Sequence, residues 1–104
     1  MSYIPKSGAG FAGVASKSAA YSVGSADQFV EVTCSTADIA ITLPAATGSG
    51  RVIVVKKVDA TAFKANITPA GTDTIEGVNA AFAVGTQWQS VSAIDVASGK
   101  WEVF

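Results

Sequence analysis

The chain has 104 residues, enough for one domain and too few for two. Charged residues make up 14% and apolar residues 49%, and the net charge is −1, so little charge keeps a lone monomer soluble. Seven scattered basic residues, matched by eight acidic ones, exclude the electrostatic footprint of a nucleic-acid-binding protein. We therefore expect copies of the chain or a partner protein to cover part of its surface.

Residues 1–26 are dominated by Gly, Ala and Ser and predict an extended N-terminal arm. The large apolar side chains of this segment follow neither a helical period nor a sustained strand period. We expect a partner to hold the arm in place, and packing of the arm onto its own domain is the alternative. The residues of the arm predicted to contact that partner are Tyr3, Ile4, Phe11, Val14 and Tyr21.

Residues 27–104 change to short strands separated by turn residues and predict a single β-domain. Strands are expected over 29–34, 39–43, 51–58, 63–68, 74–75, 80–84, 87–96 and 100–104. The nearly continuous apolar run from Arg51 to Val58 is typical of a strand covered on both faces. No window has the period of an amphipathic helix. We predict an all-β fold, a small β-sandwich or barrel of seven to eight short antiparallel strands.

The small-residue loop from Pro44 to Gly50 admits two interpretations, a phosphate cradle or a corner between two strands. A phosphate-binding loop needs a lysine followed by Ser or Thr after its glycines, and it leads into a helix. Here Arg51 follows the glycine, and the next residues are Val-Ile-Val-Val, which favour a strand. Without a helix N-terminus the loop is predicted to be a corner, and the same holds for the Ser-Gly turn at 98–99.

Residues suited to catalysis are scarce in this sequence. There is no histidine, which removes the commonest general base and the commonest metal ligand. Asp73 and Glu76 are the best-spaced carboxylates, but they lie in a Gly-rich segment where Asp commonly holds a turn. Asp59, Asp95 and Glu102 are expected to be solvated at strand ends or on outward faces. We therefore expect no enzyme activity and no catalytic, cofactor-binding or metal site.

The lone cysteine, Cys34, can form neither an internal disulfide nor a zinc site. It alternates with Val30 and Val32, which predicts a small buried core residue rather than a reactive thiol. Glycines interrupt the N-terminal region where a signal peptide would need an apolar run, and the run Val52 to Val55 is too short to cross a bilayer. We expect no membrane contact, and folding in a reducing cytoplasm.

Two tryptophans, Trp88 and Trp101, fall in alternating segments near the C-terminus. Such aromatic residues could stack on sugars or bases, but packing in the core or at a subunit interface is the favoured interpretation. Together with the last residue, Phe104, they are the predicted subunit-interface residues.

Three segments carry a resemblance to a known family: "ITLPAATGSGRVIVVKKV", "ITPAGTDTIEG" and "WQSVSAIDVASGKWEVF". Their order resembles a module found in structural proteins of tailed bacteriophages, over about residues 38–104. Members of that family are trimeric β-domains on tail fibres and tailspikes, or trimeric decoration (cement) proteins on capsids. The resemblance implies a homotrimer and no catalytic residues.

The chain lacks the coiled coil, collagen-like run or β-helix repeat that gives a fibre its reach. The favoured expectation is therefore a virion protein, made in the host cytoplasm, that trimerises on the capsid surface and binds the major capsid protein through its arm. The alternative is a tail fibre or tailspike module whose loops at 44–50, 71–79 and 97–100 contact the host cell surface.

Overall fold

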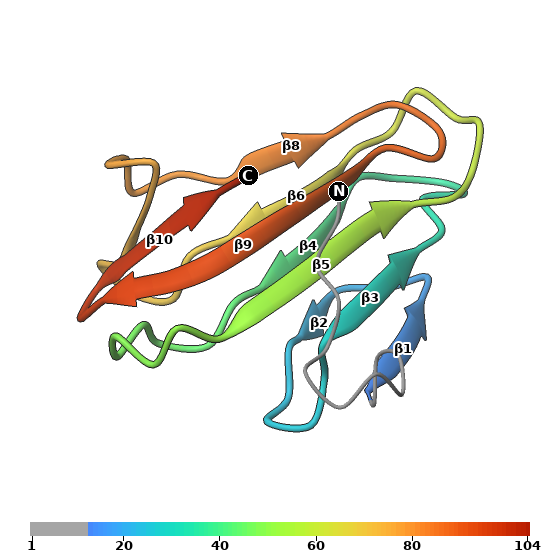
Figure 1. Ribbon diagram of the computed structural model, residues 1–104. Helices are drawn as coiled ribbons and strands as arrows, with labels where there is room; N and C mark the ends of the chain where they lie inside the picture. The colour runs from blue at the N-terminus through green and yellow to red at the C-terminus, as the bar shows by residue number, and fades with distance from the viewer. Residues whose placement is uncertain (1–12) are drawn as a thin grey trace.

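The computed structural model describes residues 13–104, which form ten β-strands in two facing sheets (Figure 1). The six-stranded sheet has the order β1 (Val14–Lys17), β3 (Phe29–Val32), β5 (Val52–Lys57), β9 (Ser90–Ala97), β10 (Lys100–Val103) and β7 (Thr74–Ile75). The four-stranded sheet has the order β2 (Tyr21–Ser22), β4 (Ile39–Thr42), β6 (Ala65–Thr68) and β8 (Phe82–Val84). The predicted all-β class is confirmed, and the predicted arm residues Tyr3, Ile4 and Phe11 lie outside the described residues.

Strand direction differs from the prediction, because both sheets are mixed rather than antiparallel. The first six strands alternate between the two sheets, so that β1, β3 and β5 are parallel neighbours in one sheet and β2, β4 and β6 in the other. Antiparallel pairs join β5 to β9, β9 to β10, and β6 to β8. Hydrophobic alternation locates a strand but does not encode its direction. When the chain crosses between the sheets after each strand, the strands that become neighbours in one sheet are parallel.

The segment predicted as a separate arm is, from residue 13 onward, part of both sheets. Strand β1 pairs with β3 and strand β2 pairs with β4, so no break in the fold lies at residue 26. The carbonyl of Gly13 accepts hydrogen bonds from the amides of Gln28 (2.8 Å) and Phe29 (2.9 Å). For residues 13–26 the structure shows packing onto the chain's own domain, because backbone pairing satisfies polar groups whatever the side chains.

The core lies between the two sheets and contains β-branched and aromatic side chains. Val30, Ile53 and Val55 from the six-stranded sheet share one cluster with Ile41 and Ile67 from the other. Cys34 is fully buried in this cluster, which confirms its prediction as a core residue. All four residues of Val52–Val55 are buried, as expected for a strand covered on both faces.

Trp101 belongs to this core and not to the surface. Its side chain is 1% exposed, and its indole Nε1 donates a hydrogen bond to the carbonyl of Pro44 at 3.1 Å. The prediction of Trp101 as a subunit-interface residue is therefore corrected, since a side chain buried within its own chain has no surface to offer a second copy.

Candidate assembly interface

One face of the six-stranded sheet points away from the four-stranded sheet and carries a row of apolar side chains. Val14 is in register with Phe29, Phe29 with Val54, and Val54 with Ser92. Phe104 exchanges two backbone hydrogen bonds with Ser92 and extends the row. Residues in register point to the same side of a sheet, and Val54 is absent from the core cluster that holds its neighbours Ile53 and Val55.

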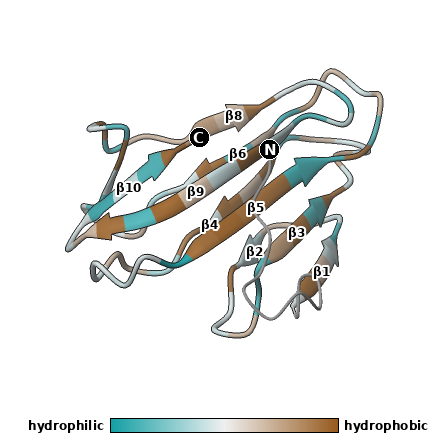
Figure 2. Ribbon diagram, viewed as in Figure 1, coloured by the Kyte–Doolittle hydropathy of each residue, from teal (hydrophilic) through white to brown (hydrophobic). Residues whose placement is uncertain are grey.

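A second row on the same face contains Val52 in register with Ile94, and β9 places Val96 two residues further along. We call this surface the outer apolar face; its accessible members are Val14, Phe29, Ile94, Val96 and Phe104, whereas Val52 and Val54 lie on the same side of the sheet but are buried within the chain. Three of these side chains are largely open to solvent, with exposed fractions of 64% for Val14, 61% for Phe104 and 40% for Val96. Figure 2 shows hydrophobic colour along β5, β3 and β9, the strands that carry most of this face.

Trp88 borders the outer apolar face in an unusual conformation. Its backbone is left-handed, with φ of 67°, and its side chain is 61% exposed. The Nζ of Lys56, which is in register with Ser90, lies 5.9 Å from the centre of the indole ring. A left-handed backbone costs a bulky residue about 1–2 kcal/mol, and the largely exposed indole gains only partial burial in return. An exposed aromatic side chain in this setting is suited to contact with another molecule.

The loop at 44–50 does surround an anion, but the anion is the chain's own Asp95. The carboxylate of Asp95 accepts hydrogen bonds from the amides of Thr47 (3.0 Å) and Gly48 (2.7 Å) and from the hydroxyl of Ser49 (2.8 Å). The loop connects β4 to β5 and is a corner, as predicted, with these donors already engaged. The expectation of a solvated Asp95 was wrong, since its side chain is 3% exposed.

Burial alone would raise the pKa of Asp95. The hydrogen bonds from the loop outweigh burial, led by the Thr47 amide, then the Ser49 hydroxyl and the Gly48 amide, and lower this pKa to about 2. Asp95 therefore stays ionised at neutral pH and ties the corner to β9 as a structural residue.

A second carboxylate, Asp59, is also engaged rather than solvated as predicted. Its Oδ2 lies 2.7 Å from the Nζ of Lys57, whose side chain is fully buried. Lys57 Nζ also donates to the carbonyls of Asp59 (2.8 Å) and Thr61 (2.9 Å). Burial would raise the pKa of Asp59, but the hydrogen bonds from Lys57 and Thr61 hold it far below its usual range. The pair fixes the connection from β5 to β6.

Of the other acidic residues named from the sequence, Glu76 lies in a turn and Glu102 is exposed, as predicted, whereas Asp73 binds the loop at 44–50 rather than its own turn. Asp73 Oδ2 accepts a hydrogen bond from the amide of Ala46 at 2.8 Å. Glu76 has a φ of 52°, and Glu102 is exposed. Across residues 13–104, no three His, Cys, Asp or Glu side chains are grouped so as to hold a metal ion. Nor does this range contain a helix long and apolar enough to cross a membrane.

Sequence reasoning named Trp88, Phe104 and Val14 as contact residues without placing them on a common surface. It missed Val96, because alternation along β9 assigns residues to two faces but does not say which face a second sheet will cover. Comparisons with protein-family models, with curated proteins and with solved structures find no match to this chain.

Proposed function

We propose that this chain is a non-enzymatic virion structural protein of a tailed bacteriophage, a capsid decoration (cement) protein. The observation that supports this most is the exposure of Val14, Val96, Phe104 and Trp88 on and beside one sheet face. Scattered apolar residues are ordinary on protein surfaces, but a gathered set marks an interaction site. The family resemblance over residues 38–104 supplies the phage assignment.

In this proposal three copies associate about a threefold axis and bury their outer apolar faces. The segment ahead of β1, with Tyr3, Ile4 and Phe11, contacts the major capsid protein. Of the two predicted arm residues within the described part, Val14 is exposed on the outer apolar face, so this proposal gives it a contact with another copy instead of the capsid. Tyr21 is half-buried, and its hydroxyl donates a hydrogen bond to Asp27.

Stabilisation of the shell follows from mass action, since the arms bind only assembled capsid and must be released before disassembly. A trimer that bridges several capsid subunits multiplies this effect, because each further contact forms at a high effective concentration.

The test is to compare phage particles carrying the full chain with particles carrying a chain that begins at residue 13, ahead of β1. We expect the shorter protein to keep its fold, to occupy the capsid less, and to lower the temperature at which heads rupture. Adsorption to host cells should not change. Equal occupancy and equal heat resistance would contradict attachment through the arm.

The second candidate, a tail fibre or tailspike module, is favoured by a specific observation. Strands β1 to β6 pass alternately between two sheets with parallel neighbours, which is the winding used by β-solenoids in elongated proteins. The turns of this winding differ in length, since Val14, Phe29 and Val54 are in register but 15 and 25 residues apart. The winding therefore leaves no regular repeat in the sequence. For this function, substitutions in the loops at 44–50, 71–79 and 97–100 should reduce adsorption and leave head stability unchanged.

A further inference from the structure

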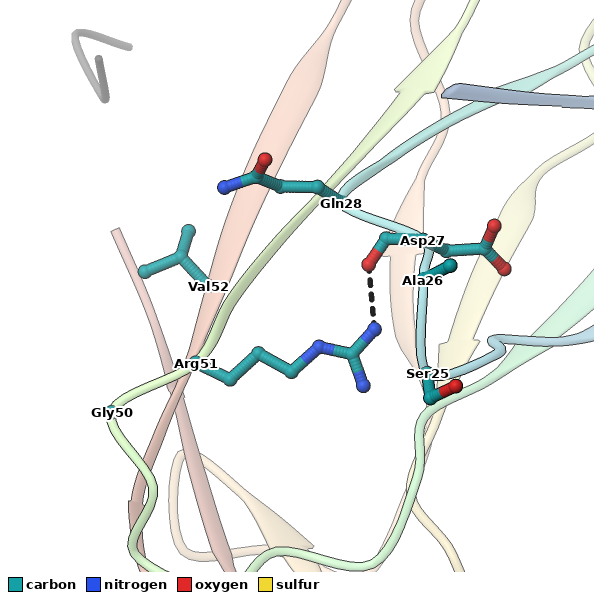
Figure 3. A pocket seen from close by; sticks show the side chains of 7 residues that line it. All are labelled: Ser25, Ala26, Asp27, Gln28, Gly50, Arg51 and Val52. Carbon is teal, nitrogen blue, oxygen red and sulfur yellow. Dashed lines mark hydrogen bonds between the residues drawn. The ribbon is translucent and has the colours of Figure 1, made fainter. Parts of the chain in front are cut away.

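A hollow of about 240 Å³ opens between the turn that connects β2 to β3 and the start of β5 (Figure 3). It is lined by Ser25, Ala26, Asp27, Gln28, Gly50, Arg51 and Val52. No side chain of the core cluster lines this hollow, and the loop that surrounds Asp95 contributes Gly50 to its lining. The hollow is large enough for one sugar ring.

The guanidinium of Arg51 is held in a fixed position in this hollow. One terminal nitrogen, Nη2, donates hydrogen bonds to the carbonyls of Gly24 at 2.6 Å and Asp27 at 2.5 Å. The other two nitrogens, Nε and Nη1, have no hydrogen-bond partner within residues 13–104. Their three N–H groups are donors whose direction is set before any ligand arrives.

No carboxylate of the described part of the chain forms an ion pair with Arg51, although the Asp27 carboxylate is near enough to interact with its charge. The ion pair found within residues 13–104 joins Lys57 and Asp59, which lie outside the hollow. Asp27 is the nearest acidic residue by sequence on this turn, yet its carboxylate is directed away from the guanidinium (Figure 3). It accepts hydrogen bonds from the Tyr21 hydroxyl and from the amide of Gly24 at 2.8 Å. The hollow therefore presents the Nε and Nη1 donors of Arg51, while the hydrogen-bonding groups of the Asp27 carboxylate are engaged elsewhere.

We propose that this hollow is a binding site for an acidic saccharide unit, whose carboxylate is bound by the free N–H groups of Arg51. Guanidinium and carboxylate match as planar partners that form two parallel hydrogen bonds. The hydroxyl of Ser25 and backbone groups of the turn line the rest of the space and suit sugar hydroxyl groups. The proposal does not depend on which virion surface carries the chain.

The test is a titration of the ¹⁵N-labelled full chain, followed by the amide signals and by the Arg51 Nε–H signal in NMR spectra. The probes are sodium glucuronate, glucose as the neutral match, and inorganic phosphate as a bare oxyanion. We expect saturable shifts with glucuronate at Arg51 and at residues 25–28 and 50, with a Kd of roughly 1 mM. Glucose should produce none, and phosphate should bind at least about tenfold more weakly.

Two substitutions sharpen the result. Arg51→Lys keeps the charge but loses the planar fork, and should weaken glucuronate binding about tenfold or more. Lys64→Gln removes one positive charge in the connection from β5 to β6, directly before β6, and should leave the Kd unchanged. If Arg51→Lys is poorly folded, the titration of the unaltered chain decides alone. Equal shifts with glucose, tighter binding of phosphate, or no shift with glucuronate would overturn the proposal.

Discussion

On the six-stranded sheet, alternate residues of β9 face opposite ways and meet different surroundings. Val91 and Ala93 pack into the core against the four-stranded sheet, whereas Ile94 and Val96 point away from it. Both faces are built from the same apolar residue types, yet within residues 13–104 a second sheet covers the inner face alone, and Val14, Val96 and Phe104 of the outer face stay exposed. An apolar strand face therefore indicates burial without saying whether the fold or an assembly provides it.

The largest expected effect contrasts two aromatic residues at the C-terminus. Trp101→Ala should lower the free energy of unfolding by about 3–5 kcal/mol, because it removes a fully buried side chain and leaves a cavity. Phe104→Ala, on the outer apolar face, should change it by less than about 0.5 kcal/mol. Chemical denaturation of both variants as dilute monomers measures the difference, and equal losses would contradict the division into two faces.

The next largest effect is expected at the inward-facing carboxylate of Asp95. Asp95→Asn should lower the free energy of unfolding by about 2 kcal/mol at neutral pH. The pKa of Asp95 is lowered from 3.8 to about 2, so its contribution is fully present above pH 3.8 and is lost as pH falls through about 2. The stability gap between the two proteins should close over that interval in urea unfolding experiments.

Glu102→Gln is the matched control for Asp95→Asn, since Glu102 is exposed on the neighbouring strand β10. It should change stability little at any pH. A stability gap between the unaltered chain and Asp95→Asn that persists unchanged at pH 1.5 would contradict the role given to the ionised carboxylate.

Val14 belongs to the outer apolar face only while β1 is paired with β3, and this pairing requires glycine at position 13. A Cβ at residue 13 would lie 1.7 Å from the carbonyl oxygen of Ala26, so Gly13→Ala must displace backbone. We expect a loss of about 1–2 kcal/mol and faster hydrogen exchange at residues 14–17, with β5 unchanged. Gly24→Ala is the control, because its Cβ would make an ordinary contact of 3.4 Å with Asp27. Similar exchange in both variants would refute this account of β1.

The smallest expected effect concerns Trp88, whose left-handed backbone suits glycine. Trp88→Gly should leave the monomer as stable or raise its stability by up to about 1 kcal/mol, while weakening self-association. Gln87→Gly, at a neighbouring position without a positive φ, should lower stability slightly instead. A loss of more than about 1 kcal/mol in Trp88→Gly would show that the indole serves the fold rather than a partner.

Strand positions were largely predictable from sequence, because alternation and turn residues are local signals. Strand direction was not, since the parallel pairing of β1, β3 and β5 depends on connections that cross between sheets. Asp95 was misplaced because the loop at 44–50 meets it only in the folded chain, and Asp59 because the burial of its near neighbour Lys57 is set by the fold. Trp88 and Trp101 share the same local pattern, and only the backbone angle and the second sheet distinguish their surroundings.

The most direct test of the outer apolar face is sedimentation equilibrium of the full chain over a wide concentration range, beside the double variant Val96→Ser, Phe104→Ser. The account predicts that the unaltered chain associates beyond its monomer mass of 10.5 kDa, and that the double variant stays monomeric with unchanged unfolding free energy. A chain that remains a 10.5 kDa monomer at every concentration, with both proteins behaving alike, would contradict it.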